Sequence, residues 1–333
     1  DGVLAVIGQL QGLELPARAW ETQVLPARVA QYDPADLEGL CLAGAVAWGR
    51  LRADAPPDDV AAPRRARSPG RAAPLAFVLR EDLPWLLAPA AGTPPDLSSA
   101  AHAVHTHLAT RGASFLADVA RATGLVPAAA EEALWTLVAR GLVTGDGVAG
   151  LRALLAKPET QRRARRLRAV RGGRPRLVAA GRWALLRAGD VEGAEPDPMR
   201  CARQSLRRYG VVVRELLARE TRMPPWRALL GALRTLEARG EVRGGRFVAG
   251  LVGEQFALPE AVEALRAVRR GASEPETVIV AAADPLNLVG ILVPGTRLAA
   301  VAHEVVAFRD GVAVEAGELG TVLSRLGRAR AGA

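Results

Sequence analysis

Apolar side chains recur at helical spacing between residues 224 and 240. The face that they form consists of Leu229, Leu230, Leu233 and Leu236. Gly240 follows the last of them, and glycine suits the left-handed conformation with which many helices end. The pattern therefore predicts an amphipathic helix that ends at Gly240.

A β-hairpin is predicted directly after this helix. Residues 241–243 lead into the dipeptide Gly244-Gly245, and residues 246–248 return from it. Two consecutive glycines tolerate the positive φ angles of a tight hairpin turn. A helix that feeds a short hairpin is the second half of a winged helix, so the segment predicts a module of that kind.

A similar unit is predicted earlier in the chain. Ser114 is expected to cap a helix over residues 115–122, and Pro127 to open a longer helix that ends at Gly141. The glycines and aspartate of residues 145–147 are expected at the tip of the wing that follows. This order predicts a helix-turn-helix followed by a small hairpin.

The first 52 residues give a related but less complete pattern. Residues 20–29 read as a helix, and a second helix is expected to start at Pro34 and to stop at Gly44. Residues 46–51 then alternate between apolar and small or polar side chains, which is typical of a strand. The order helix, helix, strand predicts a winged-helix-like module.

The remaining segments differ in character. Residues 53–73 lose periodicity and collect proline, glycine and charge, which predicts a linker, and a short apolar segment follows at residues 75–79. Residues 278–318 carry β-branched runs separated by turn dipeptides, which predicts a small β-rich domain. The predicted divisions of this α+β chain are a winged-helix-like module at 1–52, a linker with a packing segment at 53–99, a winged-helix module at 100–160, an arginine-rich connector at 161–182, a winged-helix module at 183–270 and a β-rich C-terminal domain at 271–333.

Charge adds a hypothesis about the partner. The 44 basic and 35 acidic side chains give a net charge of +9, which favours association with polyanions, although a GC-rich genome also enriches arginine. Residues 161–176 hold eight arginines and no acid, and they are either a solvated linker or an arm that contacts phosphate. Guanidinium groups fork onto phosphate oxygens, and an aromatic ring can stack on a base, although tryptophan is more often a core anchor. The candidate DNA-binding residues are Arg234, Arg239, Arg243, Arg246, Trp226, Arg227, Arg163 and Arg166.

Several classes of protein are excluded or disfavoured. A phosphate-cradling P-loop requires Gly-Lys-Ser/Thr, and the sole lysine, Lys157, lies in Leu-Ala-Lys-Pro, so this chain contains no ATPase motif. Cys41 and Cys201 stand far apart, which predicts neither a disulfide framework nor a zinc site, and no metal or cofactor is expected. The absence of an apolar run of about 18 residues and of a signal peptide predicts a cytoplasmic protein without a membrane partner. Because the chain opens at Asp1, it is expected to be a piece of a longer polypeptide.

Segments spread over nearly the whole chain resemble the large helicase-related (Lhr) family, in the C-terminal region that follows the ATPase core. The segments that carry the resemblance are residues 10–51, 133–155, 209–220, 224–261 and 284–290. The resemblance implies tandem winged helices, a terminal barrel-like β element, DNA binding and a role in DNA repair. It also implies self-association and, in some members, removal of uracil from DNA on a fold similar to that of the AlkZ-type (YcaQ-like) glycosylases. The expected partners are therefore single-stranded DNA or a tailed duplex, the ATPase core of the same polypeptide and a second copy of the chain.

The resemblance transfers no catalytic residue. A glycosylase needs a carboxylate or an amide near the sugar to activate or position water, together with a pocket for a flipped base. The candidates are the carboxylates of Asp310, Asp284 and Glu254 and the amides of Gln255 and Asn287. Each carboxylate has a structural alternative: Asp310-Gly311 as a hairpin turn, Asp284-Pro285 as a turn start, and Glu254 as the partner of an arginine. Two functions stay open: a DNA-binding region with or without glycosylase activity, and an oligomerisation domain that binds DNA weakly.

Overall fold

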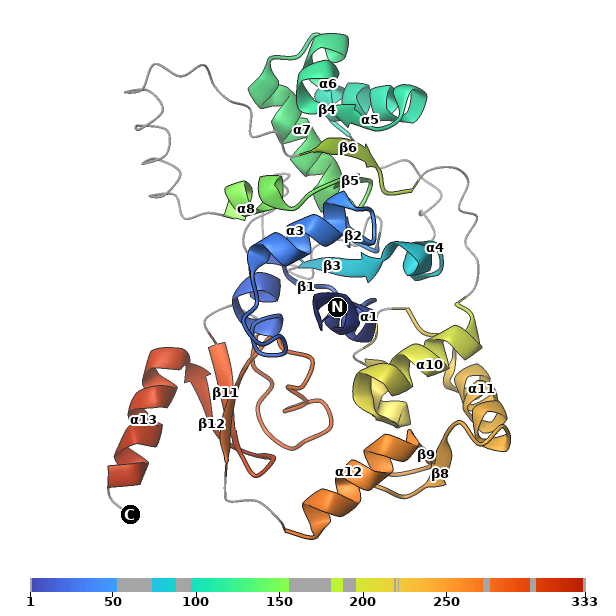
Figure 1. Cartoon of the computed structure of the whole chain (residues 1–333), viewed down its shortest axis with the longest axis vertical. Coiled ribbons are helices and arrows are strands. Elements are labelled where there is room, and N and C mark those ends of the chain that lie inside the picture. The colour runs from blue at the N-terminus through green and yellow to red at the C-terminus, as the bar shows by residue number, and fades with distance from the viewer. Residues whose placement is uncertain are drawn as a thin grey trace. The chain divides into compact units, whose positions relative to one another are not determined.

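The computed structural model describes residues 2–52, 74–87, 97–155, 181–187, 196–218, 220, 222–271, 276–299 and 304–331 of the 333-residue chain. The chain forms two compact units. Unit 1 comprises Asp1–Glu21 and Leu25–Ala194, and unit 2 comprises Thr22–Val24 and Glu195–Ala333. Figure 1 shows the elements of both units. No helix within the described ranges is long and apolar enough to cross a membrane.

The first winged helix opens unit 1. Its elements are α1 (Gly2–Leu10), β1 (Leu15–Pro16), α2 (Ala17–Ala19), a π-helical turn η1 (Trp20–Val24), α3 (Pro34–Leu42), β2 (Val46–Gly49) and β3 (Pro74–Leu79). The three strands are antiparallel in the order β1-β3-β2. A 3-10 turn η2 (Arg80–Asp82) and α4 (Leu83–Leu86) follow β3.

Local signals explain part of this module. The helix predicted at Pro34 is confirmed, and the Asp33 carboxylate caps it by accepting a hydrogen bond from the Ala35 amide at 2.8 Å. The helix predicted over residues 20–29 is confirmed only in its first half, because the helical run formed by α2 and the π-helical turn ends at Val24. The apolar segment that was predicted only to pack is the central strand β3, since it pairs with β1 and β2.

The second winged helix completes unit 1. Its elements are α5 (Ser99–Arg111), β4 (Ser114–Phe115), α6 (Leu116–Thr123), α7 (Pro127–Ala139), β5 (Val143–Gly145), α8 (Ala149–Leu155) and β6 (Arg182–Leu185). The strands are antiparallel in the order β4-β6-β5. The helix predicted to open at Pro127 and to stop before Gly141 is confirmed, with Gly141 at φ 68°.

Two predictions for this module are wrong. Ser114 does not cap α6, because it lies in β4 and its hydroxyl donates to the Gly112 carbonyl. Residues 145–147 are not the tip of a tight hairpin, because the chain continues into α8 and returns only at β6. The Asp146 carboxylate accepts a hydrogen bond from the Arg182 Nε at 2.8 Å, which joins the two ends of this insertion. Residues 182–185 therefore belong to the second module and not, as predicted, to the connector and the third module.

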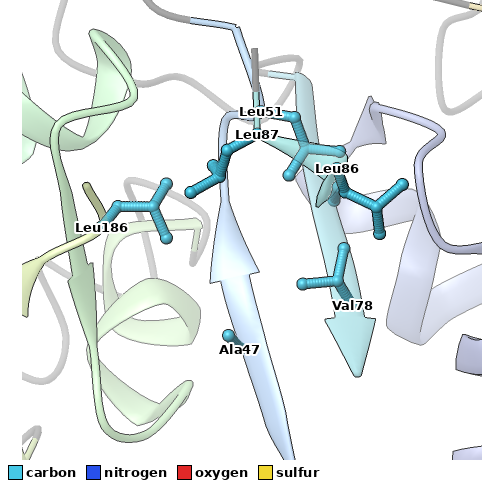
Figure 2. Packing of buried hydrophobic residues seen from close by; sticks show 7 residues of the cluster. Ala47, Leu51, Val78, Leu86, Leu87 and Leu186 are labelled. Atoms are coloured by element: carbon cyan, nitrogen blue, oxygen red, sulfur yellow. The ribbon is translucent and has the colours of Figure 1, made fainter. Parts of the chain in front are cut away.

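Tryptophan and leucine side chains fix the first two modules to each other. The rings of Trp48, Trp135 and Trp183 form a triangle: the Trp48 centroid lies 6.4 Å from each of the other two, which are 5.1 Å apart. The Thr144 hydroxyl donates to the Trp48 carbonyl at 2.6 Å. Leu186, directly after β6, joins a buried cluster on β2 and β3, and Figure 2 shows it pointing toward Leu87. The prediction that these tryptophans are core anchors is confirmed.

Unit 2 begins with the third winged helix. Its elements are α10 (Pro198–Tyr209), β7 (Val211–Val212), a 3-10 helix η3 (Arg214–Ala218), α11 (Trp226–Ala238), β8 (Arg243–Gly245), β9 (Gln255–Ala257) and α12 (Pro259–Arg269). The strand order β7-β9-β8 repeats the orders β1-β3-β2 and β4-β6-β5. In each module, helix, strand, helix, helix and strand thus follow one another, and a third strand later in the chain lies in the middle of the sheet. The predicted series of tandem winged helices is confirmed.

A small sheet and one helix end the chain. The strands β10 (Thr277–Ala281), β11 (Glu304–Arg309) and β12 (Val312–Glu318) are antiparallel in that order, and α13 (Leu319–Ala331) follows them. Val322 and Leu326 of α13 pack on Val305 and Ala307 of the sheet. The β-rich domain is confirmed, but within the described residues β10 and β12 do not pair with each other. The sheet is therefore open, and the barrel-like expectation is not met there.

Candidate nucleic-acid interface

Helix α11 of the third winged helix separates an apolar face from a polar one. Leu229, Leu233 and Leu236 are at most 1% exposed, as their spacing predicts. The opposite side exposes Arg227 and Arg234, which lie seven residues and therefore about two turns apart. In the first and second modules the corresponding helices are α3 and α7.

Side-chain contacts hold the wing that follows α11 in place. Gly244 pairs with Phe256 and Gly245 with Gln255, so both glycines lie in β8 and the predicted hairpin turn at Gly244-Gly245 is wrong. The wing is instead formed by residues 246–254. The buried Gln255 carboxamide oxygen accepts hydrogen bonds from the Phe247 and Val248 amides, each at 2.8 Å. This side chain shifts the turn away from the two glycines.

The helix and the wing meet through a carboxylate. The Glu237 Oε1 accepts a hydrogen bond from the Gly244 amide at 3.0 Å. A hollow of about 480 Å³ lies beside this contact. It is lined by Glu237, Gly244, Gly245, Arg246, Gly253, Glu254 and Phe256. The positioning roles of Glu237 and Gln255 were not predicted from the sequence, in which Gln255 stands out only as a polar side chain followed by an apolar strand.

The predicted DNA-binding arginines of this module differ in their ion pairs. The Arg234 Nη2 contacts both oxygens of Glu254, at 3.0 and 2.9 Å, and the Arg239 Nη1 lies 4.0 Å from the Glu241 Oε1. Arg203 also binds Glu241, and the hydrogen bond that it donates lowers the pKa of that carboxyl below its usual value.

The other predicted arginines of the module face solvent. Arg227, Arg243 and Arg246 are exposed, and none of them has an ion pair within the described part of the chain. Trp226 is half-buried at the start of α11. Arg163 and Arg166 lie outside the described residues. The five predicted arginines of this module therefore lie on or next to one helix and one wing, and Arg227, Arg243 and Arg246 are available to a ligand.

The equivalent helices of the first two modules are unlike α11. Neither α3 nor α7 contains an arginine or a lysine. Glu38 of α3 accepts hydrogen bonds from the Val148 amide and from Arg152, so the second module covers this helix. Helix α7 exposes Glu131 and Glu132. Because carboxylates repel phosphate, α11 is the helix that suits a polyanion among these three.

The catalytic candidates lie on separate elements and have structural roles. Glu254 pairs with Arg234 on the wing. Asp284 is 1% exposed in the loop after β10, where its carboxylate accepts a hydrogen bond from the Leu286 amide at 2.8 Å. Asp310 and Gly311, at φ 51° and 80°, form the two-residue turn between β11 and β12, which confirms the hairpin expectation for this dipeptide. The structure does not bring the three carboxylates together in one site.

Among the described residues, the thiols and histidines show no arrangement suited to a metal. Burial raises the pKa of the Cys41 thiol to about 12 and that of the Cys201 thiol to about 11, so both are protonated near neutral pH. Burial also lowers the pKa of His105. Within the described ranges, no group of three or more His, Cys, Asp or Glu side chains could hold a metal ion.

The repeated strand order and the arginine-bearing helix and wing define a tandem winged-helix protein. Two family models, both described as a winged-helix domain of the large helicase-related protein, match residues 1–62 and 192–277. Both matched segments are therefore Lhr-family winged-helix domains, and the resemblance found in the sequence is confirmed.

Two curated relatives extend the match over most of the chain. The "Lhr helicase/uracil glycosylase" of Escherichia coli (strain K12) is 31% identical over 317 residues, which are 88% of this chain and 20% of that protein. The "Lhr helicase/ probable uracil glycosylase" of Mycolicibacterium smegmatis is 31% identical over 315 residues, which are 87% of this chain and 19% of that protein. This chain is homologous to their C-terminal part and spans about a fifth of their length.

Proposed function

We propose that this chain is a DNA-binding region of an Lhr-type helicase that acts in DNA repair, and that the third winged helix grips the sugar-phosphate backbone. One observation carries the proposal: Arg227, Arg243 and Arg246 are exposed on the helix and wing of one module, with no ion pair among the described residues. Guanidinium groups donate paired hydrogen bonds to phosphate oxygens and remain charged at every physiological pH. The ATPase core of the same polypeptide is then the motor that moves the bound strand.

The first turn of α11 supports the same contact. It contains no acidic residue, and Arg227 is its second residue. The amide groups and the positive end of the helix dipole favour an anion at this position. A phosphate near Arg227 would therefore meet both a guanidinium group and the helix terminus.

The salt dependence of DNA binding tests this proposal. Each phosphate contact contributes about 0.9 to the slope of log K against log salt for duplex DNA and about 0.7 for a single strand. We expect R243A/R246A to lower the slope by about 1.4 to 1.8. The control is R269A/R270A, which removes two exposed arginines at the end of α12, outside the helix and wing. An unchanged slope for the wing variant, or an equal loss in the control, rejects the wing as a phosphate contact.

Removal of uracil from DNA is the second candidate function, and the printed names of both relatives favour it. The purified chain is incubated with single-stranded DNA that contains one uracil, and alkali then cleaves any abasic site. Strand breakage above that of a heat-treated sample supports the activity, and its absence rejects it for uracil. The variants E254Q, D284N and D310N then show whether any of the three carboxylates is required.

A further inference from the structure

The wing of the third winged helix ends in apolar side chains that face solvent. Val252 is 81% exposed and Val248 is 37% exposed, and Leu251 between them is half-buried. A single exposed valine is ordinary on a protein surface. Three apolar side chains within five residues of one loop form a small apolar tip, which we call the wing tip (Val248, Leu251 and Val252).

Backbone contacts give the wing tip a fixed shape. The Gln255 carboxamide accepts from the Val248 amide at 2.8 Å and donates to the Val248 carbonyl at 2.9 Å and to the Leu251 carbonyl at 3.4 Å. Gly250 and Gly253 adopt φ angles of 82° and 94°, which turn the chain back toward β9. The apolar side chains are thus presented on an organised loop, so a partner meets them without ordering a flexible segment first.

Cations stand at the base of the same wing. Arg243 lies in β8 and Arg246 directly after it, and both are exposed without an ion pair in the described part of the chain. A partner that satisfies the whole wing therefore offers negative charge at the base and apolar surface at the tip. A nucleic acid has both, because its phosphates are charged and the faces of its bases are apolar.

We infer that the wing tip packs against base faces that are exposed where a duplex opens into a single strand. This inference depends on the proposed function and specifies the DNA substrate. Within an intact duplex the base faces are stacked on one another, and an apolar side chain reaches them only by unstacking a step. At a junction the last pair has one face uncovered, and contact with that face is gained without this cost. Arg243 and Arg246 then hold the phosphates on either side of the junction.

Two DNA substrates and two sets of valine substitutions in the full chain test this inference. Binding is measured to a tailed duplex with 2-aminopurine in the last base pair and to a fully paired duplex of the same length. For V248S/V252S we expect about a five-fold loss of affinity for the tailed duplex, and little change for the paired duplex. The control is V268S on α12, where Val268 is 78% exposed, and no change is expected on either substrate.

The fluorescence of 2-aminopurine gives a second readout. With the unsubstituted chain the emission at the junction changes on binding, and with V248S/V252S this change is lost even when the DNA is saturated. If V248S/V252S loses affinity equally for both substrates, or for neither, the inference is wrong. The proposed function is still supported in that case if the unsubstituted chain binds DNA in a salt-dependent manner. An unsubstituted chain that binds neither DNA overturns both. Because all three valines are exposed, thermal melting of the variants is expected to match that of the unsubstituted chain.

Discussion

Replacement of Arg152 by alanine is expected to loosen the joint between the first two winged helices. Arg152 lies on α8, and its Nε and Nη2 groups contact the Glu21 carboxylate at 2.7 to 3.0 Å. Its Nη1 donates to Glu38 at 3.2 Å, and its Nη2 also donates to the Pro34 carbonyl at 2.6 Å. One guanidinium group thus holds the π-helical turn and α3 of the first module against the second.

The magnitude follows from the burial of the groups left behind. The Arg152 side chain is 30% exposed, and those of Glu21 and Glu38 are 19% and 21% exposed. Leaving a fully buried charge without its partner costs about 3 to 5 kcal/mol, and partial access of water to these carboxylates reduces that value. We therefore expect R152A to lower the free energy of unfolding of unit 1 by about 2 to 3 kcal/mol.

The distribution of tryptophans provides the assay. Trp226 is the one tryptophan of six that lies in unit 2, so urea unfolding followed by fluorescence in a W226F background reports unit 1. The control is R121A, since Arg121 and Asp118 form an exposed pair with side chains 80% and 47% exposed, and a loss of at most about 0.5 kcal/mol is expected. A loss for R152A no greater than that for R121A would refute the argument that Arg152 fixes the joint.

Three further predictions concern the wing and the thiols. E254Q frees Arg234 for phosphate and is expected to raise the affinity for DNA about three- to ten-fold at low salt. The control E263Q breaks the exposed pair with Arg266 and is expected to leave the affinity unchanged. Equal affinities for E254Q and the unsubstituted chain would contradict this prediction. Q255A removes the acceptor of the Phe247 and Val248 amides and is expected to speed their hydrogen exchange about ten-fold or more. Unchanged exchange would show that Gln255 does not organise the wing. Burial raises the pKa of Cys41 to about 12 and that of Cys201 to about 11, so both thiols stay protonated at pH 8. We expect the folded chain to react with a thiol reagent about 100-fold more slowly than the chain unfolded in urea. Rapid labelling of the folded chain would contradict this prediction.

Local signals predicted the elements whose ends are set by neighbouring residues. Asp33 and Pro34 start α3, Pro127 starts α7, and Asp310-Gly311 makes the turn between β11 and β12. In each case the residue that decides the structure lies within a few positions of the structure itself, so the sequence contains the answer locally.

Contacts between residues distant in sequence account for the failures. Strand β6 pairs with β5 across an insertion of more than thirty residues, and nothing near residue 182 indicates that partner. The turn expected at Gly244-Gly245 lies instead within residues 246–254, because the buried side chain of Gln255 binds the backbone at residues 247 and 248. A glycine pair permits a turn without requiring one, and the tertiary contact decided the register.

The candidate site was predicted in part. The arginines of α11 and the wing could be named from the sequence, but the pairing of Arg234 with Glu254 depends on how the wing folds back toward the helix. The same pairing confirms the structural alternative for Glu254 as the partner of an arginine, although the sequence did not identify Arg234 as that partner. The covering of α3 by the second module likewise depends on Arg152 and Val148, more than a hundred residues away.

Hydrogen exchange on the chain with and without a tailed duplex tests the central claim most directly, because it compares the three equivalent helices in one experiment. We expect slower exchange in α11 and in residues 243–257 when DNA is bound, and unchanged exchange in α3 and α7. Protection of α3 or α7 with no change in α11 and the wing would contradict it.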